Sequence, residues 1–387
     1  MLFAIGAAVF LVLALHPFML YPLSLLLARR GQSQLLSPVR DERPRIAICM
    51  SAFNEERVIV AKVEGLLAMA EEYGPATIHI YVDGAEDSTA TLLAPYADRV
   101  DLVVSQDRRG KTAGLNLLVQ RSSGDLLAFT DANVVTPRDG LVKLAAAFAD
   151  PTVGCATARL SYSNPDETGM SFAGALYWRL EEAIKTLETE TVGVLGVDGA
   201  FFMMAREVYE PAPEYLIDDF YVSLCALAQG RRVVSVDEVE VFERNATRAG
   251  EEFKRKARIA CQAMNVHRAL WPRLVRMRPL LLYGYVSHRL LKWLMPFTLA
   301  LAGLCVLGAL VQFAGWAPVA LAIALGGAAV ALGAYVGFKP ARLMLSVATS
   351  FAGVGLGVLQ SVGGRSTYTV WTPAASIRDG EGGLDPT

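Results

Sequence analysis

Polar side chains follow three apolar stretches in the first half of the chain, and their types could do chemistry. The segment Ser51–Glu55 follows the first stretch, Asp83 ends the second, and Thr130–Asn133 closes the third. A buried carboxylate is costly unless it is paired, bound to a ligand or used in a reaction. If the three stretches are strands of one parallel sheet, these groups meet at one edge and predict a ligand site there.

Two further groups carry charge in a pattern that could serve such a site. Asp218 and Asp219 open a predicted helix, where acidic residues are also favoured for structural reasons alone. Arg255, Arg258 and Gln262 share one face of a later predicted helix. Two arginines on one face suit a diphosphate, and they equally suit anionic lipid headgroups.

The elements that must position these groups alternate along residues 45–270. Apolar stretches typical of buried strands are separated by helical stretches, which predicts an α/β fold with a parallel sheet and helices on both of its faces. The predicted strands are Ile46–Met50, Ile78–Val82, Leu102–Ser105 and Leu126–Thr130. The predicted helices are Glu55–Glu72, Asp87–Tyr96 and Thr112–Gln120.

The N-terminal end of the chain is apolar enough to enter a bilayer. The chain has 53% apolar and 19% charged residues, whereas soluble domains have about 25% charged residues. About 20 apolar residues span a membrane. Residues 1–30 therefore predict a retained transmembrane helix, with a kink at Pro17 or Pro22. Arg29 and Arg30 place its C-terminal end, and the α/β domain, in the cytoplasm at the inner membrane.

The C-terminal third, residues 294–362, repeats this pattern. Leu294–Phe313 and Pro318–Phe338 are predicted spans, whereas Leu343–Val362 could span the membrane, re-enter it or lie at its surface. The segment 271–293 mixes basic residues with Leu and Tyr, which is typical of an interfacial helix in contact with membrane lipids. These basic residues are Arg276, Arg278, His288, Arg289 and Lys292. Residues 374–387 predict a flexible tail.

Other features of the sequence argue against several functional classes. The net charge of −2 does not favour a nucleic-acid partner, and the five cysteines form no CxxC pair that would indicate a zinc site. The glycine-rich dinucleotide fingerprint is absent after the first strand. The stretch Ser105–Thr112 approaches a phosphate-binding P-loop, but serine stands at the first glycine position. A dehydrogenase and an NTPase are therefore disfavoured.

Seven short stretches occur in an order that points to one family. They read SAFNEE, VDGAEDST, RRGKTAGLN, FTDANVV, DGAFFMMARE, IDDFYVSL and FKRKARIACQ. Together they resemble the family 2 inverting glycosyltransferases with the GT-A fold, a Rossmann-like nucleotide-sugar domain. The resemblance covers about Arg45 to Leu270, and the apolar flanks are similar to those of the membrane-embedded branch. That branch includes synthases of poly-N-acetylglucosamine, hyaluronan and cellulose.

The resemblance implies roles for individual residues in binding a nucleotide sugar, with uracil as the expected base. Asn54 and Glu55 would lie near the nucleoside and Asp83 at the nucleobase, although Asn54 could instead cap a helix and Asp83 could shape a turn. Lys111 would face the phosphates or the sugar, although it could also be a solvated surface charge. The implied substrate-binding set is Asn54, Glu55, Asp83, Lys111, Asp131, Arg255 and Arg258.

The resemblance also implies a metal ion and a catalytic base. The stretch TDAN stands where the family has its Asp-x-Asp metal motif, so Asp131 and Asn133 would bind Mg²⁺ or Mn²⁺ through oxygen atoms. Asp219 matches the second member of the family's acidic pair, which is the general base. The alternative for Asp219 is a structural role at the start of its helix.

The leading hypothesis is a membrane-bound, metal-dependent inverting glycosyltransferase. It would move a sugar from a nucleotide sugar, with UDP as the expected carrier, to a polysaccharide or a lipid-linked saccharide. The sequence departs from the family pattern at Val82, Asn133 and Ile259, where the family has Asp, Asp and Trp. The alternative is therefore a catalytically degenerate subunit that scaffolds a polysaccharide synthase complex.

Overall fold

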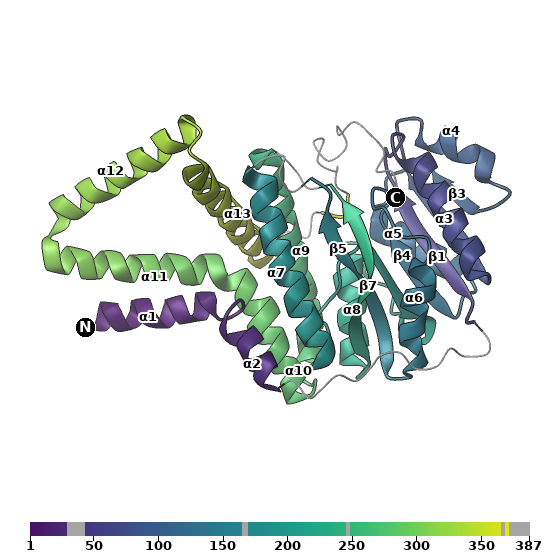
Figure 1. Cartoon of the computed structure of the whole chain (residues 1–387), viewed down its shortest axis with the longest axis horizontal. Coiled ribbons are helices and arrows are strands. Elements are labelled where there is room, and N and C mark those ends of the chain that lie inside the picture. The colour runs from purple at the N-terminus through teal and green to yellow at the C-terminus, as the bar shows by residue number, and fades with distance from the viewer. Residues whose placement is uncertain (29–42, 165–168, 245–247, 365–367, 371–387) are drawn as a thin grey trace.

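The computed structural model describes residues 1–28, 43–164, 169–244, 248–364 and 368–370. Arg29, Arg30 and the predicted tail at 374–387 lie outside these residues. In Figure 1 a sheet flanked by helices occupies one end of the molecule, and long apolar helices extend away from it at the other. The strands are β1 (Ile46–Ala52), β2 (Ala76–Asp83), β3 (Asp101–Ser105), β4 (Leu126–Thr130), β5 (Val153–Tyr162), β6 (Phe201–Ala205) and β7 (Arg232–Glu243).

Two groups of helices surround and extend this sheet. Those that belong to the α/β region are α3 (Ile59–Tyr73), α4 (Thr89–Leu93), α5 (Lys111–Arg121), α6 (Gly140–Ala146), α7 (Gly169–Glu190), α8 (Asp218–Ala228) and α9 (Ala249–Leu274). The flanking helices are α1 (Leu2–Leu15), α2 (Leu20–Ala28), α10 (Pro279–Gly284), α11 (Leu291–Ala314), α12 (Trp316–Tyr335) and α13 (Lys339–Val362). A π-helical segment, Tyr285–Leu290, joins α10 to α11.

The sheet is mixed, although the sequence predicted only its parallel part. Its seven strands have the order β3-β2-β1-β4-β6-β5-β7. The four strands predicted from sequence are parallel to one another, but β6 runs antiparallel to both β4 and β5. The alternating pattern that predicted the parallel sheet extended only to β4, and the antiparallel strand enters later, between α7 and α8.

The sheet is covered on both faces, which explains the uninterrupted apolar sequence of its central strands. Ala47 and Cys49 of β1 point into a core formed with α5, α7, α8 and α9, whereas Ile46, Ile48 and Met50 point into a second core formed with α3, α4 and α6. Successive side chains of a strand alternate between faces, so each strand contributes to both cores. This packing fixes the strand ends that carry the polar groups.

The helix after β1 starts later than the sequence predicted, at Ile59 instead of Glu55. Asn54 adopts a left-handed backbone conformation, with φ of 52°, and the chain turns before the helix begins. The backbone N–H of Glu55 donates to the Thr89 hydroxyl over 2.8 Å, and that of Glu56 donates to Asp87 over 3.1 Å. These donors are satisfied by the turn after β2, so the helix need not extend to them.

The flanking helices have the length and composition of membrane spans. Three helical segments qualify, Pro279–Ala314, Trp316–Tyr335 and Lys339–Val362, and the pair Leu2–Leu15 and Leu20–Ala28 qualifies together across a bend of 57°. The bend falls at the break that contains Pro17, one of the two positions where we expected a kink. The sequence identified all four apolar stretches, including the third C-terminal one.

Basic residues at the C-terminal end of the segment 271–293 contact protein groups. His288 is fully buried, and its Nδ1 lies 2.6 Å from Oε1 of Glu188 on α7. The Tyr21 hydroxyl on α2 donates to the same oxygen over 2.8 Å. Lys292 pairs with buried Glu181 over 2.7 Å. The α/β region and the apolar helices are therefore joined by a buried polar cluster.

Candidate active site

A pocket of about 860 Å³ lies beyond the carboxyl ends of β1, β2 and β4, as the polar strand ends predicted. Helices α8 and α9 and the end of β7 form its other walls. Of the predicted residues it brings together eight, and it leaves out Asn54. Those eight are Glu55, Asp83, Lys111, Asp131, Asn133, Asp219, Arg255 and Arg258.

Asn54 and Asp83 both organise backbone turns at one end of the pocket. The side-chain oxygen of Asn54 accepts a hydrogen bond from the N–H of Glu86 over 2.8 Å, so Asn54 does not cap the following helix. The carboxylate of Asp83 is 2% exposed and accepts hydrogen bonds from the N–H groups of Arg109 (2.7 Å) and Gly110 (3.0 Å). The buried acid at the end of β2 therefore holds the turn that leads to Lys111. Its contact with a nucleobase stays a prediction.

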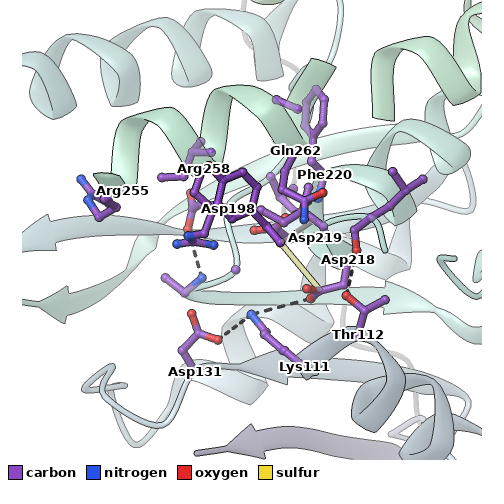
Figure 2. Close-up of a pocket in the computed structure, with 18 of the residues that line it drawn as sticks. Lys111, Thr112, Asp131, Asp198, Asp218, Asp219, Phe220, Arg255, Arg258 and Gln262 are labelled. Carbon is purple, nitrogen blue, oxygen red and sulfur yellow. Dashed lines mark hydrogen bonds and ion pairs between the residues drawn. The ribbon is translucent and has the colours of Figure 1, made fainter. Parts of the chain in front are cut away.

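Lys111 is the centre of the charged group in the pocket. It is the first residue of α5, and its Nζ lies 2.6 Å from Oδ1 of Asp131 and 3.7 Å from Oδ2 of Asp218 (Figure 2). Burial alone would lower the pKa of Lys111, but the carboxylates of Asp131, Asp218 and Asp219 outweigh burial and raise that pKa. Lys111 is therefore a charged residue of the pocket and not a solvated surface lysine.

Asp219 is a buried carboxyl group directed at the same space. It is 8% exposed, and its Oδ1 accepts a hydrogen bond of 2.6 Å from the N–H of Phe220. A Cβ at Gly199 would lie 3.0 Å from Oδ2 of Asp219 and 2.9 Å from Nζ of Lys111, so only a glycine leaves this space open. Burial, followed by the charge of Asp218, raises the pKa of Asp219 to about 7.

The two predicted arginines have different surroundings, although both belong to α9. Arg255 pairs with Glu252 on its own helix, with Nε 2.8 Å from Oε2, so its charge is already compensated. Arg258 lies one turn further along the pocket wall (Figure 2). Burial and the neighbouring charge of Arg255 lower the pKa of Arg258 to about 10, which leaves it protonated at neutral pH.

The comparisons with known proteins agree with this geometry. The sequence model of the family described as "Glycosyltransferase like family 2" matches residues 44–262, more than half of the 387-residue chain.

The chain belongs to glycosyltransferase family 2.

Relatives of this family 2 glycosyltransferase carry several activities in their names. This chain is 28% identical over 206 residues to an N-acetylglucosaminyltransferase of Rhizobium leguminosarum bv. viciae. The match covers 49% of this chain and 48% of the relative. This chain is 26% identical over 134 residues to a beta-monoglucosyldiacylglycerol synthase of Nostoc sp., which covers 33% of this chain and 29% of that relative. The chain thus spans about half the length, or less, of these curated relatives.

A solved structure resembles the whole molecule. A mannosyltransferase of Pyrobaculum calidifontis, in complex with GDP-Man and Mn²⁺, aligns with a TM-score of 0.71 at 20% identity and covers 94% of this chain and 99% of its own. At this identity the likeness shows the fold. The family and the GT-A fold predicted from the sequence are confirmed.

The family 2 domain contains two site residues that the sequence analysis missed. Glu243 ends β7 and accepts a hydrogen bond of 3.1 Å from the side-chain amide of Asn133, and burial raises its pKa to about 7. Lys62 of α3 is buried and donates to the Thr130 hydroxyl (2.9 Å) and to the Val134 carbonyl (2.7 Å). Lys62 thereby holds both ends of the turn that carries Asp131. The sequence signal that could have identified Lys62 is a lysine among the apolar residues on the buried face of α3.

The groups that surround Asp131 include the candidate ligands of the predicted metal ion. In the part of the chain that the structure describes, no three His, Cys, Asp or Glu side chains are arranged to hold a metal ion by themselves. Asp131 is about one-third exposed, and Lys111 is bound to its Oδ1. Because Asn133 uses its amide N–H₂ on Glu243, its carbonyl oxygen is left as an acceptor. Asp131 and Asn133 thus offer a partial set of hard oxygen donors.

Proposed function

We propose that this chain is an inverting glycosyltransferase that moves a sugar from a nucleotide sugar to an acceptor hydroxyl. The observation that carries the proposal is the arrangement of Lys111, Asp131 and Asp219 around Gly199, inside the pocket of a family 2 domain. A scaffolding subunit would not need a buried acid with a pKa near neutrality next to a charged lysine.

Asp219 is the proposed general base. As the acceptor oxygen attacks the anomeric carbon, Asp219 takes the hydroxyl proton, and the bond from that carbon to the diphosphate breaks. The nucleoside diphosphate leaves with the bonding electron pair. A base is most effective when its pKa lies near the working pH, which matches the pKa of about 7. Attack opposite to the leaving group inverts the anomeric centre.

Lys111 and Arg258 are proposed to neutralise the departing diphosphate. Both line the pocket and both are protonated at neutral pH, because the pKa of Lys111 is raised and that of Arg258 is about 10. Fixed positive charge aimed at a developing anion is usually the largest single contribution to such catalysis. Arg255 is proposed to act in the same region, although Glu252 already compensates its charge.

The donor oxygens near Asp131 fit a divalent cation that also takes ligands from the diphosphate and from water. We propose that Asp131 and Asn133 hold Mg²⁺ or Mn²⁺, since both ions prefer oxygen ligands. The ion would supply additional charge neutralisation at the leaving group. Lys62 and Glu243 would support it by fixing the Asp131 turn and the orientation of the Asn133 amide.

The four apolar helical stretches support a membrane location, with the family 2 domain on the cytoplasmic side where nucleotide sugars are made available. The pocket is lined at one end by Trp293 and Lys292 of α11, which belongs to a candidate span. An acceptor held at the membrane could reach this end. We therefore propose a polysaccharide or a lipid-linked saccharide as the acceptor.

The test is the release of nucleoside diphosphate by the purified full chain in a detergent that has no sugar headgroup. UDP-N-acetylglucosamine, UDP-glucose and GDP-mannose are offered with Mg²⁺, with Mn²⁺ or with excess chelator. We expect one nucleotide sugar to be consumed, and release to require the metal and to be lost in Asp131→Ala. If none of the three nucleotide sugars is consumed, the proposed enzyme activity is wrong. If release continues undiminished in chelator, the proposed metal dependence is wrong.

A further inference from the structure

The side chain of Gln262 is buried in the pocket wall without a hydrogen-bond partner for its carbonyl oxygen. Gln262 is 4% exposed and belongs to α9, one turn after Arg258. Within the described part of the chain, no donor reaches its Oε1. A buried amide oxygen without a partner is unfavourable, and native proteins seldom retain one unless water or a ligand satisfies it.

The position of Gln262 identifies which part of the pocket it serves. In Figure 2 its amide extends from α9 toward Asp219, whereas Asp131 and Lys111 lie farther from α9. The diphosphate is proposed to bind at Asp131, Lys111 and Arg258, whereas Asp219 is proposed to meet the acceptor. Gln262 therefore faces the acceptor side of the proposed reaction.

The pocket that Gln262 lines also contains apolar and aromatic side chains. Phe220 of α8 and Trp293 of α11 meet edge to face, with ring centroids 5.4 Å apart, and both line the pocket. Ile259 and Ala263 of α9 line the same region. A single amide among such groups can both accept and donate a hydrogen bond, so it matches a hydroxyl group, which can do the same. Aromatic rings with a few placed polar groups are suited to the mixed surface of a sugar ring.

We propose that Gln262 binds a hydroxyl group of a saccharide acceptor, next to the hydroxyl that Asp219 deprotonates, and that Phe220 and Trp293 contact the apolar face of that sugar. This inference rests on the proposed function and names the residues that would recognise its saccharide acceptor. Gln262 makes and breaks no covalent bond. It fixes the acceptor so that one hydroxyl, and not another group or water, meets Asp219.

The experiment separates transfer to a sugar from transfer to water. Nucleoside diphosphate release by the full chain is measured in the non-glycosidic detergent, first without an acceptor and then with octyl β-glucoside, octyl α-mannoside or 1-octanol. Octanol has the same alkyl chain and one hydroxyl, but no neighbouring hydroxyl. The variants are Gln262→Met, which keeps the length of the side chain, and the control Gln120→Met, an exposed glutamine at the end of α5.

We expect an octyl glycoside to stimulate release by the wild type more strongly than octanol. In Gln262→Met this stimulation should fall roughly tenfold or more, as expected for a lost hydrogen bond in a buried site. Release without acceptor should stay unchanged, which shows that the variant folds and still uses the donor. Gln120→Met should behave as the wild type.

Four outcomes would contradict the inference or its basis. Equal stimulation of Gln262→Met and wild type would remove Gln262 from acceptor binding. The site does not recognise a sugar if octanol stimulates the wild type to the same extent as both glycosides. The same conclusion holds if none of the three probes stimulates the wild type. Either result applies regardless of how the variant behaves. No release from any nucleotide sugar, with or without acceptor, would instead overturn the proposed function.

Discussion

Asp218 and Asp219 are neighbours in the sequence, but their surroundings separate their roles. Oδ2 of Asp218 lies 3.7 Å from the Lys111 ammonium, and that charge opposes the rise that burial causes in the pKa of Asp218. Asp219 is fixed at Oδ1 by the N–H of Phe220, and its other oxygen faces the space beside Gly199. The helix start thus places one acid against the lysine and leaves the other available to the acceptor.

The raised pKa of Asp219 predicts that activity depends on pH around neutrality. Because the carboxyl group must be ionised to accept a proton, kcat/KM should rise as pH increases through about 7. Asp218→Asn removes the charge that, after burial, raises this pKa most, so the midpoint should move to lower pH. The two acids interact, so the wild-type midpoint belongs to the pair.

The measurement is kcat/KM for the nucleotide sugar across neutral pH for the wild type and Asp218→Asn, with the affinity for nucleoside diphosphate recorded at each pH. A flat profile at constant affinity would contradict the role of Asp219 as base. A midpoint that stays in place or moves upward in Asp218→Asn would contradict the electrostatic explanation.

Helices α9 and α13 form the element-scale link between the pocket and the candidate spans. α9 carries Arg255, Arg258 and Gln262 on its pocket side, and α13 packs closely along it. A Cβ at Gly353 would lie 2.9 Å from the carbonyl oxygen of Phe253, and one at Gly357 would clash with the carbonyl of Ala257. Gly353 and Gly357 therefore allow the two helices to pack backbone to backbone.

This packing predicts that Gly357→Ala destabilises the protein. The added methyl group meets backbone atoms, which cannot move aside, so the free energy of unfolding should fall by about 1–3 kcal/mol. The matched control is Gly326→Ala on α12, where nothing lies within 4 Å of the new Cβ. The Tm of both variants in detergent checks the prediction. An unchanged Tm for Gly357→Ala, or an equal decrease for both, would contradict the packing.

At this scale the sequence predicted some features and missed others for physical reasons. Period-2 and apolar patterns identified the first four strands and the four apolar stretches, because these follow from local side-chain burial. They did not predict antiparallel β6 or the Glu243 contact with Asn133, and they gave a turn shaped by Asp83 only as one of two alternatives. Each of these depends on residues brought together from distant parts of the chain.

At the scale of the whole molecule, the pocket and the membrane-type helices form one connected body. Buried Glu188 joins Tyr21 of α2 to His288 of the π-helical segment. Arg289 then donates to the carbonyls of Leu195 and Gly196, over 2.6 Å in each case, in the segment that leads to Gly199. The apolar helices therefore contact the backbone that shapes the pocket. In Figure 1 they extend away from the sheet on the side opposite to α3 and α4.

The proposed use of a nucleotide sugar predicts that the family 2 domain faces the cytoplasm. A cysteine introduced at exposed Glu71, at the end of α3, should resist an impermeant thiol reagent in intact cells and react after permeabilisation. Four native cysteines are buried, so the partly exposed Cys305 is first replaced by alanine. Rapid labelling of this cysteine in intact cells would contradict the cytoplasmic orientation.

The most direct test of the central claim is the Asp219→Asn variant, assayed for sugar transfer and for nucleoside diphosphate affinity. Asparagine keeps the size and polarity of the side chain and serves almost equally well at a helix start, but it cannot take the proton. The matched control is Asp139→Asn, a partly exposed acid at the start of α6. We predict that Asp219→Asn lowers turnover by about 10²–10⁴ and leaves nucleotide affinity unchanged. Near-normal turnover, or a loss of nucleotide affinity as large as the loss of turnover, would contradict the account.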